Sequence, residues 1–255
     1  MASRTASELF DLSGKVALVT GGSRGLGREM VLAFAAHGAD VIIASRKIDN
    51  CRAVAAEVEL LGRRAFPFAY HAARWSDADA LAEAAYGEFG RVDVLVNNAG
   101  MSPLYPSLAD VTEELFDKVV GVNLKGPFRL SANIGSRMVA EGRGSIINVS
   151  SVASHQPSPT EAPYAAAKAG INSLTKSLAA AFGPTVRVNC IVPGPFLTDI
   201  SKAWDMATFS EQAKSAYALG RGGEPHEIVG AALYFASDAS SYTTGALLDI
   251  HGLPR

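Results

Sequence analysis

The stretch KVALVTGGSRGLG, residues 15–27, decides the fold of this chain. Its first six residues form a short apolar run of the kind found in buried parallel strands. Gly21, Gly25 and Gly27 follow, and an apolar pattern with helical spacing begins at Arg28. Glycine lets a backbone approach a pyrophosphate, and a helix that starts there directs unpaired N–H groups at the phosphates. The stretch therefore predicts a dinucleotide site, although its spacing, G-x-x-x-G-x-G, is not the commoner G-x-G-x-x-G and a glycine cluster alone could be a tight loop.

Apolar runs suited to strands alternate with longer helical patterns along the rest of the chain. The expected strands are residues 15–20, 40–44, 65–69, 92–97, 145–149, 186–192 and 246–250. The intervening segments are long enough for crossover helices. We therefore expect an α/β fold in which residues 1–255 form a single domain, with a doubly wound, seven-stranded parallel sheet of the Rossmann type and helices on both faces. Its ligand crevice would lie outside the carboxyl ends of the strands.

Composition restricts the class of protein. The 255 residues are 48% hydrophobic and 19% charged, which suffices for a large core. A net charge of -2 without a sustained basic run argues against nucleic acid as a partner. Cys51 and Cys190 are too few and too far apart for a disulfide framework or a metal site, so we expect no metal and a reducing cytoplasm. No signal-like segment and no run of eighteen apolar residues occurs, so we expect no membrane contact.

A second stretch, PYAAAKAG at residues 163–170, carries Tyr164 and Lys168 four residues apart. On a helix these side chains share one face. A phenol has a pKa of about 10, and a nearby cation would bring that pKa toward neutrality and make the phenol a usable acid and base. Together with the glycine turn upstream, the pair indicates a hydride-transfer site. Taken alone, it more often describes a solvated helix face with a lysine that extends into solvent.

Further motifs make the chain resemble the short-chain dehydrogenase/reductase family over almost its whole length. The sequence NNAG follows an apolar run at residues 97–100, and Ser151 lies thirteen residues before Tyr164. Asn123 matches the fourth catalytic position of that family.

The resemblance implies four catalytic roles. Tyr164 would exchange a proton with the substrate oxygen, and Ser151 would orient that oxygen. Lys168 would lower the pKa of Tyr164 and bind the nicotinamide ribose, while Asn123 would hold a water that links Lys168 to solvent. Ser151 could instead be a helix or turn cap, and Asn123 a helix-end cap.

The resemblance also implies a nicotinamide dinucleotide. The residues expected to contact it are Gly21, Ser23, Arg24, Gly25, Leu26, Gly27, Ser45, Arg46, His71, Ala72, Asn98, Ala99, Gly100, Tyr164, Lys168, Pro193, Gly194 and Thr198. His71 stands where the family usually has an acid for the adenine amino group, and an imidazole accepts that bond only through a free, well-aimed nitrogen. The loop at 193–198 would hold the nicotinamide carboxamide, or be a plain proline-rich turn.

The end of the second strand predicts NADP(H) rather than NAD(H). Enzymes that prefer the unphosphorylated form usually carry an acid there, which binds the ribose hydroxyl and repels a phosphate. Ser45 occupies that position, Arg46 follows it, and Arg24 adds a cation from the glycine turn. Guanidinium groups bind phosphate through a planar fork. Both arginines could instead be solvated surface charges.

The expected function is therefore an NADP(H)-dependent oxidoreductase that acts on a small or medium carbonyl compound or the matching secondary alcohol. A 3-oxoacyl-carrier-protein reductase is the alternative, but only Lys176, Arg137 and Arg143 are evident cations for docking an acidic carrier. A non-catalytic dinucleotide-binding regulator is the alternative from another class.

Two sets of apolar residues complete the expectations. The substrate pocket would be lined by residues 102–105, Phe196, Trp204, Met206 and Phe209. A homodimer or homotetramer would use Phe116, Val119, Val120, Phe128 and Leu174.

Overall fold

The computed structural model describes residues 4–198, 201 and 205–253. Its sheet has seven parallel strands in the order β3-β2-β1-β4-β5-β6-β7. The strands are β1 Val16–Thr20, β2 Asp40–Ser45, β3 Ala65–Ala69, β4 Val94–Asn97, β5 Gly144–Val149, β6 Val186–Pro193 and β7 Leu247–Ile250. From β1 the chain proceeds to one edge, and from β4 it proceeds to the other. The expected doubly wound sheet is confirmed, with strand ends within two residues of the predicted ones.

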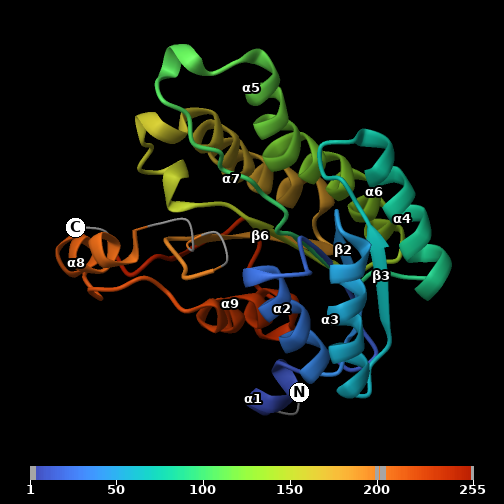
Figure 1. The fold of residues 1–255 in the computed structure, drawn as a ribbon. Coiled ribbons are helices and arrows are strands. Elements are labelled where there is room, and N and C mark those ends of the chain that lie inside the picture. The colour runs from blue at the N-terminus through green and yellow to red at the C-terminus, as the bar shows by residue number, and fades with distance from the viewer. Residues whose placement is uncertain (1–3, 199–200, 202–204, 254–255) are drawn as a thin grey trace.

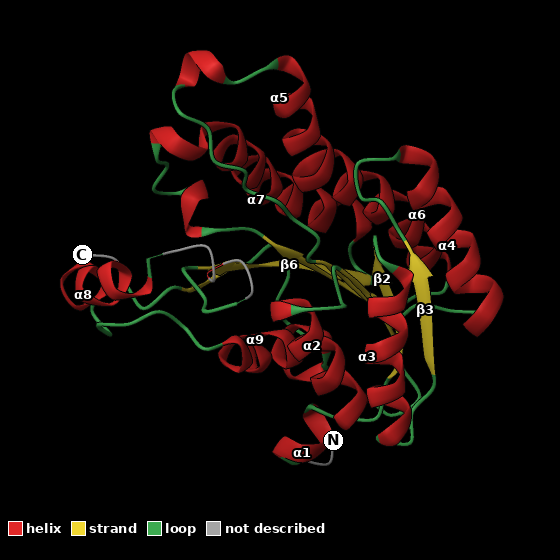
Figure 2. Cartoon of the chain, in the orientation of Figure 1, coloured by secondary structure: helices red, strands yellow, loops and turns green. Residues whose placement is uncertain are grey.

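Helices cover both faces of the sheet (Figures 1 and 2). One face carries α2 Gly25–Ala36, α3 Ile48–Leu60 and α9 Val229–Ala236. The other carries α4 Trp75–Phe89, α6 Gly126–Ala140 and α7 Ala162–Phe182. The short helices α1 Ala6–Leu9, α5 Glu113–Val120 and α8 Met206–Ala216 lie farther from the sheet.

Successive side chains of each strand point to opposite faces of the sheet, so the interior is divided into two cores. In β1, Ala17 and Val19 face the core with α2, α3 and α9, whereas Val16 and Leu18 face the core with α4, α6 and α7. All of these side chains are buried, because successive residues of a strand point to opposite faces and both faces are covered. The edge strand β3 is only partly buried and contains Pro67, which is tolerated where a backbone N–H is not needed.

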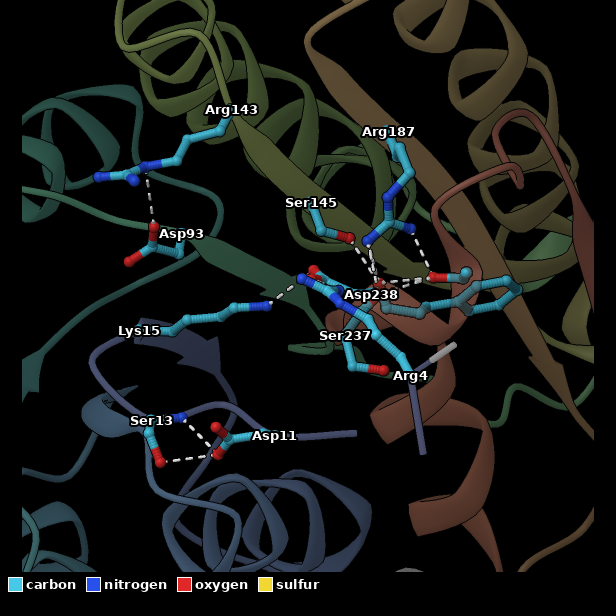
Figure 3. A network of polar contacts seen from close by, with 12 residues as sticks. Arg4, Asp11, Ser13, Lys15, Asp93, Arg143, Ser145, Arg187, Ser237 and Asp238 are labelled. Carbon is cyan, nitrogen blue, oxygen red and sulfur yellow. Dashed lines mark hydrogen bonds and ion pairs between the residues drawn. The ribbon is translucent and has the colours of Figure 1, made fainter. Parts of the chain in front are cut away.

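A polar network ties the chain end beyond α9 to the amino ends of the strands (Figure 3). The Arg187 guanidinium donates to the Ser240 hydroxyl at 2.6 Å and to the Ser237 carbonyl at 3.1 Å. Asp238 pairs with Arg4 at 2.7 Å and with Lys15 at 3.2 Å. These contacts stabilise the amino edge of the sheet. The candidate site residues lie at the opposite, carboxyl edge.

One close approach at the carboxyl edge gives a test of the packing. A Cβ on Gly126 would lie 1.9 Å from the Ala72 carbonyl oxygen, so Gly126→Ala should destabilise the protein by about 2 kcal/mol or more. Gly87→Ala is the matched control, since a Cβ there meets nothing within 4 Å and alanine favours the helix by about 0.5–1 kcal/mol. Urea unfolding at equal protein concentration measures both. Equal shifts in the two variants would contradict the packing described.

Candidate active site

The loops after β1 and β4 are joined by one hydroxyl. The Thr20 side chain donates to the Val96 carbonyl at 3.2 Å and accepts from the backbone N–H groups of Asn98 and Ala99 at 3.0 and 3.1 Å. The Asn98 amide returns a bond to the Thr20 carbonyl at 3.0 Å and another to the Gly21 carbonyl at 3.3 Å. A Cβ on Gly21 would lie 2.8 Å from that amide. The glycine turn and the loop after β4 therefore fit only because Gly21 lacks a side chain.

The turn continues directly into α2. Gly25 has a φ of +52° and borders Thr198, while a Cβ on Gly27 would lie 2.2 Å from the Gly21 carbonyl oxygen. Arg24 is the residue before the helix, and its side chain makes no capping bond. Leu26 lies in the first helical turn. This end of the helix thus keeps the N–H groups and partial positive charge that suit an anion.

Two hydroxyls and two arginines meet at the end of β2. Ser23 donates to the Ser45 hydroxyl at 2.9 Å, which links the glycine turn to β2. Arg24 and Arg46 are exposed, and neither forms an ion pair with any residue that the structure describes. Both guanidinium groups are therefore available to a ligand.

His71 and Ala72 follow β3. The His71 backbone N–H donates to the Asp77 carboxylate at 3.0 Å, and the Ala72 carbonyl packs against Gly126. The His71 Nδ1 atom is buried and has no partner within the described part of the chain. The adenine contact expected of His71 stays a prediction.

Tyr164 lies in the first turn of α7, and Ser151 lies directly after β5. The Ser151 hydroxyl accepts from the Ala153 N–H at 3.2 Å and also forms a hydrogen bond with Tyr164. It is therefore both the turn cap and the neighbour of the phenol. Burial raises the pKa of Tyr164, the bond from Ser151 lowers it, and the nearby charge of Glu161 raises it. We expected a lowered pKa; burial is a tertiary effect that the spacing of Tyr164 and Lys168 does not contain.

Lys168 is buried one helical turn from Tyr164. Its Nζ donates to the Val149 carbonyl at 2.7 Å and lies 5.6 Å from the centre of the Tyr164 ring. Burial lowers the pKa of Lys168 to about 8, opposed by the nearby Cys190 thiol. The same burial raises the pKa of Cys190 to about 12, which keeps that thiol protonated.

Asn123 lies in a π-helical turn, Gly121–Lys125, that joins α5 to α6. Its amide donates to the carbonyls of Met101 and Val119 at 2.8 and 2.9 Å, and its Oδ1 accepts from the Met101 N–H at 3.2 Å. Asn123 is thus inside a continuous helical segment and not at a helix end. A Cβ on Gly100 would lie 3.0 Å from the Asn123 Oδ1 and 3.6 Å from the Lys168 Nζ, so these two side chains reach the same point.

The loop after β6 packs on the end of the chain. Pro193 ends β6, and the Gly194 N–H donates to the Ile250 carbonyl at 2.9 Å. A Cβ on Gly194 would lie 2.6 Å from the His251 Cβ, which requires glycine here. Phe196, which we expect in the substrate pocket, is 7% exposed and belongs to the core with α9. Its contact with a substrate stays a prediction.

A shallow, open cavity lies beside Tyr164. It is lined by Pro103, Tyr105, Leu115, Val119, Glu161, Pro163 and Tyr164. Of the expected loop, Pro103 and Tyr105 line it, whereas Leu104 is 82% exposed. Trp204 lies outside the described residues, and Met206 and Phe209 are not among the lining residues given above. Sequence analysis missed Glu161 and Leu115. Glu161 lies three positions before Tyr164, and this i, i+3 spacing was the available signal.

The apolar residues expected at a subunit interface differ in exposure. Phe116 and Phe128 are exposed, Val120 and Leu174 are partly buried, and Val119 is buried beside the cavity. Within the described ranges, no helix is long and apolar enough to cross a membrane. The same part of the chain holds no group of three histidine, cysteine or acidic residues placed to bind a metal ion.

Comparisons with known proteins agree with this geometry. The family model described as short chain dehydrogenase matches residues 15–208. A 3-oxoacyl-[acyl-carrier-protein] reductase of Thermotoga maritima is 37% identical over 242 residues, 94% of this chain and 98% of that protein.

Two solved structures extend the likeness to three dimensions. A 3-oxoacyl (acyl-carrier-protein) reductase from Agrobacterium tumefaciens C58 with NADP bound has a TM-score of 0.93 at 31% identity, covering 98% of this chain and 97% of that one. A 7α-hydroxysteroid dehydrogenase complexed with NADH and 7-oxo glycochenodeoxycholic acid gives the same TM-score, identity and coverage. From its glycine turn, its fold and these matches, the chain belongs to the short-chain dehydrogenase/reductase family of oxidoreductases.

Proposed function

We propose that this protein is an NADP(H)-dependent oxidoreductase that interconverts a small carbonyl compound and the matching secondary alcohol. One observation supports the proposal: Ser151 and Lys168 both lie next to Tyr164, Asn123 and Lys168 approach the same point at Gly100, and Tyr164 lines a cavity. A regulator that only binds a dinucleotide needs no such convergence.

The chain's own residues supply the steps around the carbonyl. When bound, the nicotinamide gives or takes the hydride. Tyr164 gives its proton to the carbonyl oxygen in reduction and takes it back in oxidation. Ser151, already bonded to Tyr164, donates to the same oxygen as negative charge develops there. Lys168 and Asn123, which meet at Gly100, return the proton toward solvent.

The phosphate preference rests on residues at the end of β2. Solved relatives hold NADP in one case and NADH in another, so membership of the family leaves the preference open. Here Ser45 offers a hydroxyl in place of an acid, and Arg24 and Arg46 have no ion-pair partner among the described residues. Two guanidinium groups without ion-pair partners, and no acid at the end of β2, favour NADP(H).

A free carbonyl compound fits the cavity better than a carrier-linked acyl chain. Two of the three cations weighed for docking a carrier are occupied elsewhere. Arg137 pairs with Glu83 on α4, and Arg143 lies 3.6 Å from Asp93 at the amino end of the sheet, opposite the cavity (Figure 3). Lys176 is exposed and has no ion-pair partner among the described residues. A carrier therefore has little positive surface to meet.

We also propose a cytoplasmic homodimer or homotetramer. Phe116 and Phe128 are exposed on neighbouring helical segments, which suits a contact between copies. Cys51 and Cys190 are free thiols, which suits a reducing compartment.

Tyr164→Phe tests the proposed chemistry. Loss of the phenol hydroxyl should reduce kcat for ketone reduction by about 10² or more and leave the dissociation constant of NADPH nearly unchanged, because the glycine turn is intact. Tyr242→Phe, at a fully exposed tyrosine, is the control and should keep full activity. Nicotinamide absorbance and fluorescence titration give the two quantities. Activity that survives in Tyr164→Phe would refute the role of Tyr164.

Lys168→Met should separate stability from activity. Burial in the folded state lowers the pKa of Lys168 to about 8 from an ordinary value of about 10.4. Folding with a charged Lys168 therefore costs stability in full below pH 8. That cost disappears as the pH rises toward 10.4. The variant should lose activity and gain about 1–3 kcal/mol of stability at pH 7, less at pH 10. Urea unfolding at both pH values measures the gain. Lys176→Met, at an exposed site, is the control and should change stability by less than about 0.5 kcal/mol. If the unmodified protein is more stable than Lys168→Met at pH 7, the prediction is wrong.

The double variant Ser45→Asp, Arg46→Ala tests the cofactor preference. A new carboxylate and a lost guanidinium should shift the ratio of kcat/KM for NADPH over NADH by about 10²-fold or more toward NADH. Arg52→Ala, on the exposed surface of α3, should leave the ratio unchanged. Equal efficiency of the unmodified protein with both cofactors would rule out the proposed preference.

A further inference from the structure

The cavity beside Tyr164 contains one charged side chain. Of its described lining residues, Pro103, Leu115, Val119 and Pro163 are apolar, and Glu161 alone is ionisable besides Tyr164 and Tyr105. The Tyr105 hydroxyl is already engaged, since it donates to the Pro159 carbonyl at 2.8 Å and accepts from the Ala162 N–H at 2.7 Å. A substrate in this cavity therefore meets one charged group, the Glu161 carboxylate, whose two oxygens can accept several hydrogen bonds.

The backbone fixes where Glu161 stands. Its N–H donates to the Ser158 carbonyl at 3.2 Å, and the next residue, Ala162, is held by Tyr105. Glu161 is also the residue before α7, yet its side chain makes no capping bond to that helix. The carboxylate forms a hydrogen bond with the Ser102 side chain instead. Its position is thus set by the loop and not by the helix end.

Glu161 is electrically uncompensated. It is half-buried, and no lysine, arginine or histidine in the described part of the chain pairs with it. Burial raises the pKa of Glu161, and its charge in turn raises the pKa of Tyr164. A carboxylate whose field reaches the phenol also acts on a substituent next to the reacting carbonyl, because charges a few ångströms apart interact strongly in a poorly hydrated site.

We propose that Glu161 is a specificity-determining residue that selects carbonyl substrates carrying a hydrogen-bond donor, a hydroxyl or an ammonium group, near the reacting carbonyl, and rejects those carrying a carboxylate there. A hydrogen-bond donor on the substrate would compensate the partly desolvated Glu161 carboxylate. An apolar substituent would offer that carboxylate no partner, and an anionic substituent would be repelled by it. The inference rests on the proposed function, since it assigns the substrate class of that same cavity.

Four ketones of one skeleton test the inference. They are 4-hydroxy-2-butanone, 4-amino-2-butanone, 2-pentanone and levulinate, which place a hydroxyl, an ammonium, a methyl and a carboxylate at the same distance from the carbonyl. In the unmodified protein, kcat/KM should be highest for the hydroxy ketone and the amino ketone, lower for 2-pentanone and lowest for levulinate. Glu161→Gln keeps the size and removes the charge, so levulinate should improve about tenfold or more relative to 2-pentanone, and the amino ketone should fall by a similar factor.

The variants separate charge from hydrogen bonding. Glu161→Gln retains an acceptor oxygen and should affect the hydroxy ketone little, whereas Glu161→Leu should reduce it toward 2-pentanone. Glu114→Gln is the matched control: it removes the same charge from the exposed first turn of α5, next to Leu115, and should leave every ratio unchanged.

Binding without turnover keeps the two proposals distinguishable. Ligand-observed NMR titration gives the dissociation constants of the four compounds for each variant in the absence of reaction. If the constants follow the predicted order but no ketone is reduced, the proposed function fails and the inference stands. If the ratios of levulinate to 2-pentanone are the same in the unmodified protein and in Glu161→Gln, the inference is overturned, whatever the activity.

Discussion

The hydroxyl of Thr20 is the contact on which the rest of the site depends. It accepts the N–H groups of Asn98 and Ala99 from the loop after β4 and so holds together two loops that leave the sheet on opposite courses. The strand order reverses between these two strands, and a crevice forms where neighbouring loops diverge. With the loops joined, Gly21 and Asn98 lock the glycine turn, and Gly100 brings Asn123 to Lys168. The glycine turn and the Asn123–Lys168 contact thus depend on one anchor.

Much of this arrangement could be predicted from local pattern. The apolar run before Gly21 and the alternation within β1 specify a strand that is buried on both faces. The four-residue separation of Tyr164 and Lys168 specifies their common face. What escaped prediction depends on packing between distant segments. The burial of Phe196 comes from its contact with α9, and the raised pKa of Tyr164 comes from what surrounds the phenol. Glu161 was missed because its surroundings come from distant segments: Leu115 lines the same cavity, and Ser102 forms a hydrogen bond with the carboxylate.

The site is held against the preferences of its own residues. Lys168 is a buried amine, and its Nζ donates a hydrogen bond to the Val149 carbonyl. Asn123 interrupts a regular helix to satisfy Met101 in a neighbouring loop. Each arrangement opposes folding locally, and the two large cores on either side of the sheet offset it. The candidate site lies at the carboxyl edge of the sheet, beyond the ends of both cores.

The π-helical turn around Asn123 also sets the phase of the two helices that it joins. Successive residues of an α-helix are about 100° apart around the axis, so one additional residue in the turn rotates everything beyond it by that angle. Leu115 and Val119 before the turn face the cavity, whereas Leu130, Ile134 and Met138 after it face the core. A regular helix through residues 121–125 would direct one of these stripes into solvent. The π-helical turn therefore fixes how far α6 is rotated about the helix axis relative to α5. Adding or removing one residue in this segment would change that rotation, so its length is constrained as well as its composition.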